Sequence, residues 1–230
     1  GKLRMGAFDL QVNGYAGVDF NGDLLSGEDL DQVCEALKKD GVCGILATFI
    51  TDDLGVMCSR IERLVQLRNQ NREWSKLICG VHIEGPFLNE TQGYIGAHPV
   101  KHAKRSDLGE MKRLLEAAGG LTRIVTLAPE RDEGFMVTRF LTEQGICVAA
   151  GHCDPSIKQL QESIEAGLKM FTHLGNGCPM ELNRHDNVIQ RVLSQRHDLW
   201  ISFIPDGAHV PFVTLKNYLE LVGTDRVVMV

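Results

Sequence analysis

The amino-acid sequence has no long hydrophobic run and no excess of positive charge. Its apolar stretches are too short to span a bilayer, which takes about 20 consecutive apolar residues, and residues 1–5 lack the apolar core of a signal peptide. The formal net charge is -6 at pH 7. Nucleic acids and membrane surfaces are bound by basic faces, so we expect neither as a partner. These absences predict a soluble, cytoplasmic protein.

The cysteines lack the Cys-x-x-Cys spacing of a zinc knuckle. There are seven, an odd number, scattered along the chain and mostly inside apolar runs. Such a pattern is typical of an intracellular protein whose thiols stay reduced. We therefore expect buried thiols and no disulfide framework.

The nucleotide-binding motifs GxGxxG and the P-loop are also missing after the first predicted strand. Instead, short apolar runs alternate with helical patterns, giving eight predicted strands and seven helices at intervals of about 25 to 35 residues. This count and spacing predict an α/β protein with a (β/α)8 TIM barrel, in one domain over residues 1–230. An open doubly wound sheet is the alternative, which the missing motifs disfavour.

The predicted elements have the following bounds. The strands are 7–13, 42–49, 77–84, 122–127, 146–150, 168–172, 199–204 and 226–230. The helices are 26–39, 54–71, 106–118, 130–144, 155–166, 188–196 and 211–222.

Three polar residues stand where predicted strands end. Glu84 ends the third strand, and His152 and His173 follow the fifth and sixth. Barrel strands end around one rim, so these residues can converge. One carboxylate and two imidazoles suit Zn²⁺ or Fe²⁺, which would make water a usable nucleophile. A single strand-end histidine is more often a structural residue, but three candidates at one rim favour a metal.

Six motifs follow one another along nearly the whole chain. They are Gln11-Val12-Asn13-Gly14, His82-Ile83-Glu84-Gly85-Pro86-Phe87, Gly96-Ala97-His98, Gly151-His152, Thr172-His173-Leu174-Gly175-Asn176 and Asp206-Gly207-Ala208-His209. In this order they resemble the N-acetylglucosamine-6-phosphate deacetylases of the amidohydrolase superfamily. The resemblance implies a barrel of the metal-dependent hydrolase type, with one divalent metal, zinc or iron, held by Glu84, His152 and His173. A single metal is expected because Gln11 and Asn13 replace the His-x-His pair that helps to bind a second one.

The same resemblance implies a reaction and a substrate site. The reaction is the deacetylation of N-acetylglucosamine 6-phosphate to glucosamine 6-phosphate and acetate. His98 is the implied catalytic residue, polarising the acetamide carbonyl. Asn176, Gly177 and Arg184 would meet the phosphate, His209 the sugar hydroxyls. In some members the arginine acts across a dimer interface, so we expect a homodimer. The implied substrate-binding residues are Ala97, His98, Asn176, Gly177, Arg184 and His209.

The resemblance also implies parts that these 230 residues do not contain. The general base of the family is an aspartate just past the eighth strand, and here the predicted strand 226–230 is the last. The eighth helix and an accessory β-sandwich are absent too. We expect a barrel truncated at both ends that binds one metal but turns over poorly, because a general base contributes about 10²- to 10⁴-fold.

Two other functions remain open. The chain could be an amidohydrolase for another N-acyl amino sugar or a cyclic amide. It could also be a non-catalytic protein that keeps the site to bind a sugar phosphate. Metal content and turnover, measured together, separate these alternatives.

Overall fold

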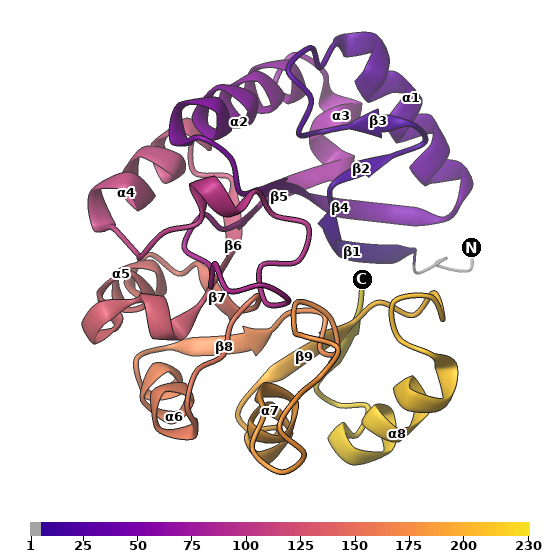
Figure 1. The fold of residues 1–230 in the computed structure, drawn as a ribbon. Helices are drawn as coiled ribbons and strands as arrows, with labels where there is room; N and C mark the ends of the chain where they lie inside the picture. Colours follow the sequence, from indigo (N-terminus) through magenta and orange to yellow (C-terminus); the bar gives the residue numbers. More distant parts are fainter. Residues whose placement is uncertain (1–5) are drawn as a thin grey trace. The chain divides into compact units, whose positions relative to one another are not determined.

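The computed structural model describes residues 6–230, so the expectation drawn from residues 1–5 lies outside it. Its main sheet follows the chain in order (Figure 1), without the reversal of strand order that defines a doubly wound sheet. Neighbouring strands pair in parallel. The predicted (β/α)8 class is confirmed by this order. The eight strands, in sheet order, are β1 (Ala7–Val12), β4 (Val42–Ile50), β5 (Ile78–Glu84), β6 (Thr122–Leu127), β7 (Cys147–Ala150), β8 (Leu168–Phe171), β9 (Trp200–Phe203) and β10 (Val227–Met229).

The described residues group into two compact units, the first made of residues 6–84 and 109–123. In this unit β4 contacts three helices, α1 (Gly27–Lys39), α2 (Leu54–Arg68) and α3 (Arg72–Leu77). A capping box begins α1, because the Ser26 hydroxyl accepts from the N–H of Asp29 while the Asp29 carboxylate accepts from the N–H of Ser26. The unit also holds the hairpin of β2 (Gly14–Tyr15) and β3 (Val18–Asp19) and most of α4 (Leu108–Ala117).

The second unit consists of residues 85–108 and 124–230. Its helices are α5 (Met136–Glu143), α6 (Ile157–Glu165), α7 (Val188–Ser194) and α8 (Phe212–Val222). Helix α5 contacts β7, and α6 contacts both β8 and α7. The short strands β7 and β8 are largely buried, and each is followed within two residues by a histidine. Across residues 6–230 no helix is both long and apolar enough to cross a membrane.

The predicted helix over 54–71 is wrong at its C-terminal end. Helix α2 stops at Arg68, and the Asn71 side chain accepts a hydrogen bond at 2.8 Å from the N–H of Glu73, which caps a second helix, α3. Asparagine is a favoured N-cap because its side chain satisfies an N–H that has no partner within the helix. The new helix takes in Leu77, so β5 begins one residue later than predicted.

The predicted helix over 130–144 is wrong at its N-terminal end, because the observed helix begins at Met136, six residues later. The buried carboxylate of Asp132 accepts hydrogen bonds from the N–H groups of Val137 at 3.1 Å and Thr138 at 2.8 Å, which fixes the start of α5. Before it, Gly134 and Phe135 have φ angles of 60° and 54°, outside the helical range. Residues 129–135 instead form the 3₁₀ turns η2 (Pro129–Arg131) and η3 (Glu133–Phe135).

The cysteines are free thiols within residues 6–230, as expected, but the expectation that they are buried holds for only some. Cys34 and Cys153 are buried, Cys43 is exposed, and the others are half-buried. An apolar run in the sequence does not decide burial, because alternate side chains of a strand point to opposite faces. Cys43 lies near the beginning of β4, before the run of buried residues that starts at Gly44.

Candidate metal and substrate site

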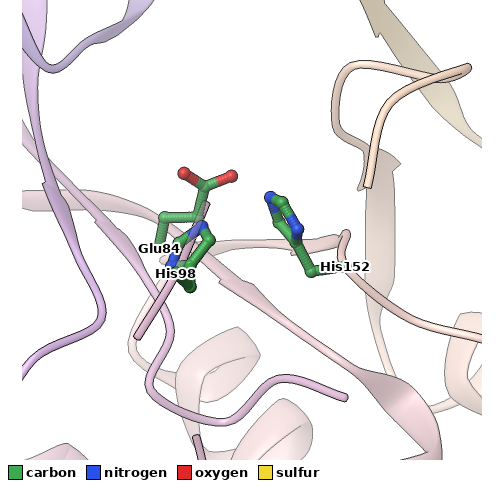
Figure 2. Close-up of side chains that lie close together, drawn as sticks. All are labelled: Glu84, His98 and His152. Atoms are coloured by element: carbon green, nitrogen blue, oxygen red, sulfur yellow. The ribbon is translucent and has the colours of Figure 1, made fainter. Parts of the chain in front are cut away.

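Glu84, His98 and His152 lie close together and could hold a metal ion. One possible ligand atom from each lies within 4.8 Å of the other two, and all three residues are buried. Figure 2 shows the carboxylate of Glu84 beside the two imidazole rings. The donor set, one carboxylate and two imidazoles, suits Zn²⁺ or Fe²⁺. The residues therefore fit one divalent metal.

Glu84 is the last residue of β5, and Gln11 on β1 holds its side chain. The Nε2 of Gln11 donates to Oε1 of Glu84 at 3.1 Å. Two residues before Glu84, the buried ring of His82 lies with its Nδ1 3.0 Å from the carbonyl oxygen of Leu10. This contact joins β5 to β1.

The ring of His152 is oriented by main-chain atoms. Its Nδ1 donates to the carbonyl oxygen of Tyr94 at 2.8 Å, which fixes a proton on Nδ1 and the orientation of the ring. The ring packs closely against Gly96 and Gly177: a Cβ on either glycine would lie 3.0 Å from Cε1 or 2.9 Å from Nδ1, respectively. The ring of His98 lies edge-on to it, with centroids 4.4 Å apart. Gly177, predicted to approach a phosphate, thus also approaches this imidazole.

His173 occupies the corresponding position after β8. It is buried, its ring centroid lies 4.9 Å from that of His152, and its N–H donates to Oγ of Ser202 at 2.7 Å. The group of ligand atoms found within residues 6–230 contains His98 rather than His173. The assignment of Glu84, His152 and His173 as the metal ligands stays a prediction.

Both His152 and His173 adopt left-handed backbone conformations, with φ angles of 50° and 36°. A non-glycine residue in this region costs about 1–3 kcal/mol and persists where the surroundings enforce it. Strained residues of this kind concentrate at active sites and ligand clamps. Two of them at neighbouring strand ends therefore favour a functional role for both histidines.

Asn176 and Gly177 lie in the loop that follows His173. The N–H of Asn176 donates to the carbonyl oxygen of His173 at 3.0 Å. Its side-chain Nδ2 is buried and has no hydrogen-bond partner among the described residues. A buried amide donor without a partner is costly, so a ligand oxygen at this point would be stabilised. Ala97 and Arg184 are exposed on their loops.

His209 is exposed, and Asp206 holds it in one orientation. The two carboxylate oxygens of Asp206 accept from the N–H of His209 at 2.9 Å and from its Nδ1 at 2.7 Å. These hydrogen bonds lower the pKa of Asp206 to about 2, because they favour the ionised carboxylate. The Nε2 of His209 is the ring nitrogen left for a ligand.

The sequence interpretation missed a group of polar residues beside His152. Oε1 of Glu130 accepts from Nδ2 of Asn89 at 2.9 Å and from the N–H of Asp154 at 2.5 Å. The carboxylate of Asp154 in turn accepts from Nη1 of Arg191 on α7 at 2.7 Å. One signal was available: Glu130 comes three residues after β6, as an acidic residue near the end of a strand, where Glu84 also lies.

Several known proteins that this chain resembles in sequence and in structure share one name. No family model matches this chain. It is 30% identical over 99% of its length to the N-acetylglucosamine-6-phosphate deacetylase of Bacillus subtilis, and 32% identical over 93% of its length to that of Bos taurus. A solved deacetylase from Mycobacterium smegmatis, a D267A mutant in complex with N-acetyl-D-glucosamine-6-phosphate, superposes with a TM-score of 0.86 at 26% identity, over 98% of this chain. The chain is similar to these deacetylases over nearly its whole length.

The predicted resemblance to the deacetylases is thereby confirmed, and their fold is the fold of this chain. The chain spans about half the length of these deacetylases: 57% of the Bacillus protein, 53% of the bovine protein and 56% of the mycobacterial chain. One similar protein is a deacetylase of a different sugar phosphate. The N-acetylgalactosamine-6-phosphate deacetylase of Escherichia coli O157:H7 is 28% identical over 88% of this chain.

Proposed function

We propose that this chain is the metal-binding part of a hydrolase that removes the acetyl group from N-acetylglucosamine 6-phosphate, releasing acetate and glucosamine 6-phosphate. The observation that carries the proposal is the buried group of Glu84, His98 and His152. It occurs on a chain that is similar over 93% to 99% of its length to two deacetylases of this sugar phosphate.

Each site residue has a proposed task. Glu84, His152 and His173 hold one divalent metal, which when bound polarises an amide carbonyl and makes water a usable nucleophile near neutral pH. His98 donates a hydrogen bond to the acetamide oxygen as negative charge develops on it. The bond from Nδ1 of His152 to Tyr94 supports this arrangement, because it fixes the orientation of the imidazole ring.

The substrate is proposed to bind through the loops after β5, β8 and β9. The buried Nδ2 of Asn176 and the N–H of Gly177 would donate to the phosphate. Arg184 would add a guanidinium, which matches phosphate geometry with paired donors. His209, oriented by Asp206, would contact the sugar hydroxyls, and Ala97 would line the acetyl group beside His98.

The remaining expectations are part of the proposal. The metal is zinc, with iron as the alternative, and the protein is a cytoplasmic homodimer. Residues 1–230 by themselves are expected to turn over slowly. Metal analysis of protein purified from its host tests the identity of the metal, and light scattering tests the homodimer.

The proposal is tested by metal content and ligand binding measured on the same purified chain. We expect one equivalent of metal, and binding of N-acetylglucosamine 6-phosphate that exceeds binding of unphosphorylated N-acetylglucosamine. Glu84→Ala should abolish stoichiometric metal. Full metal retention in that variant would show that the site is assigned wrongly. Undiminished sugar-phosphate binding by metal-free protein, without any acetate release, would favour the non-catalytic alternative.

The galactosamine relative supports a second candidate substrate. N-acetylgalactosamine 6-phosphate differs from the glucosamine compound only in the orientation of one hydroxyl, which the loop of His209 would read. Comparing the affinities of the two sugar phosphates decides between them, and His209→Ala should reduce the difference if this residue makes the distinction.

A further inference from the structure

We propose that Glu130 is a positioning residue for the metal site, because it ties the loop that carries His98 to the segment that carries His152. The inference rests on the proposed function, since it presupposes that these residues surround a metal. Glu130 itself lies outside the group of ligand atoms, in the 3₁₀ turn η2 after β6.

The first tie runs to the loop after β5. Oε1 of Glu130 accepts from Nδ2 of Asn89 at 2.9 Å, and the main-chain N–H of Asn89 donates to the carbonyl oxygen of His152 at 3.0 Å. The Oδ1 of Asn89 accepts from the N–H of Thr91 at 2.9 Å, and the carbonyl oxygen of Thr91 accepts from the N–H of Tyr94 in the turn that follows. Every polar group of the Asn89 side chain is therefore engaged in fixing this loop.

The second tie runs to the segment after β7. The same Oε1 of Glu130 accepts from the N–H of Asp154 at 2.5 Å, two residues after His152. Because one oxygen receives both hydrogen bonds, it helps to set the separation of the two segments, together with the direct bond from Asn89 to His152. That separation matters for His152, whose Nδ1 must reach the carbonyl oxygen of Tyr94 in the first loop. It also matters for His98, which follows Tyr94 by four residues.

A carboxylate at this place is costly to the fold by itself. Burial raises the pKa of Glu130, and the hydrogen bonds from Asp154 and Asn89 oppose that shift only in part. The neighbouring Asp132 is a carboxylate of the same turn region whose hydrogen bonds serve only the local fold. It accepts from the N–H groups of Val137 and Thr138 and so caps α5. Asp132 is therefore a matched control for Glu130.

The test compares three variants of the chain, using Co²⁺ as a spectroscopic probe. Groups hydrogen-bonded to metal ligands contribute about 10- to 100-fold in metal affinity. Glu130 acts through Asn89 and Asp154, so Glu130→Ala should weaken Co²⁺ binding by about 10-fold and change its visible absorption spectrum. Glu130→Gln keeps an acceptor oxygen and should restore both affinity and spectrum. Asp132→Ala should lower the melting temperature of the metal-free protein while leaving Co²⁺ affinity and spectrum as in the wild type.

Several outcomes would overturn the inference. Glu130→Ala with wild-type affinity and spectrum would do so, as would an Asp132→Ala variant that loses metal as severely. If Glu130→Ala fails to fold, Asn89→Ala replaces it, because it removes the same hydrogen bond between Asn89 and Glu130. The same loss of Co²⁺ affinity is expected, and wild-type affinity and spectrum in that variant would overturn the inference. A wild-type chain that binds no Co²⁺ would instead overturn the proposed function, so the two failures are distinguishable.

Discussion

The carbonyl oxygen of Tyr94 accepts a hydrogen bond from Nδ1 of His152 at 2.8 Å. The bond places a proton on Nδ1 and fixes the orientation of the imidazole ring. Gly96, two residues after Tyr94, lies against the same ring. The orientation of a proposed ligand is thus set by the main chain of one loop, and a small change in that loop should reach the metal.

Gly96→Ala is expected to weaken metal binding. Gly96 has a φ of +59°, and an added Cβ would lie 3.0 Å from Cε1 of His152. The substitution therefore adds a left-handed backbone cost of about 1–2 kcal/mol and displaces the imidazole. Co²⁺ titration and thermal unfolding measure the two effects.

Gly145→Ala is the control for this substitution. Gly145 has a φ of +72°, and none of the described atoms lies within 4 Å of the Cβ that the substitution would add. The variant should lose similar backbone stability yet bind Co²⁺ as the wild type does. Equal Co²⁺ affinities in the two variants would contradict the proposed contact between Gly96 and His152.

His98→Ala and His173→Ala are expected to separate metal binding from carbonyl polarisation. If His173 is the third ligand, its removal abolishes stoichiometric metal, whereas removal of His98 leaves metal bound and lowers turnover. Loss of one oxyanion-stabilising donor typically costs about 10²- to 10³-fold in kcat. Metal analysis of both variants gives the answer. The reverse pattern, metal lost only without His98, would assign the ligands as Glu84, His98 and His152.

Asp206→Asn is expected to weaken sugar-phosphate binding through His209. The asparagine keeps an acceptor for the N–H of His209 but presents an NH₂ where Oδ2 now accepts from Nδ1. Isothermal calorimetry measures the loss. In a His209→Ala background the same substitution should have little further effect, since its influence acts through that ring. Additive losses would contradict this coupling.

The ionisation of Asp206 has a predictable pH range. Its pKa is lowered to about 2 by hydrogen bonds from His209, so these contacts stabilise the loop above pH 3.8, the ordinary value for aspartate. The contribution is lost as the pH falls from 3.8 through about 2. An NMR titration of the side-chain carboxyl group should show this low midpoint, and a midpoint near 4 would mean that the hydrogen bonds are not formed in solution.

The thiols are expected to differ widely in reactivity. Burial raises the pKa of Cys34 to about 11 and that of Cys153 well above its ordinary value, so both remain protonated at pH 8. Exposed Cys43 should react first with a thiol reagent. Mass spectrometry of partly labelled protein tests this order. Labelling of Cys34 as fast as Cys43 would contradict it.

The sequence predicted the parts of the fold that depend on local pattern. Apolar runs and helical patterns predicted the order of the eight strands, and the strand ends predicted that Glu84, His152 and His173 converge. The structure groups the first two with His98. Two helix boundaries differ from the predicted ones, because side-chain caps compete with the periodic pattern. Asn71 starts a helix within the predicted one, and Asp132 delays another until Met136.

The polar ties around His152 could not be predicted from spacing. Glu130 lies 41 residues from Asn89 and 24 from Asp154, and no periodicity connects them. Each bond exists only because the strands β5, β6 and β7 bring their following loops together. The same holds for the packing of Gly96 and Gly177 on His152, which depends on two loops far apart in the chain.

The sequence by itself determined the alternation of strands and helices and the chemical type of the candidate site, because both depend on residue type and local order. Only the tertiary structure decided which atoms face each other. It grouped Glu84 with His98 and His152, engaged Nδ1 of His152 with Tyr94, and gave Glu130 a place between two loops. The physical reason is that hydrogen bonds and close packing act over a few ångströms in space, whatever the separation along the chain.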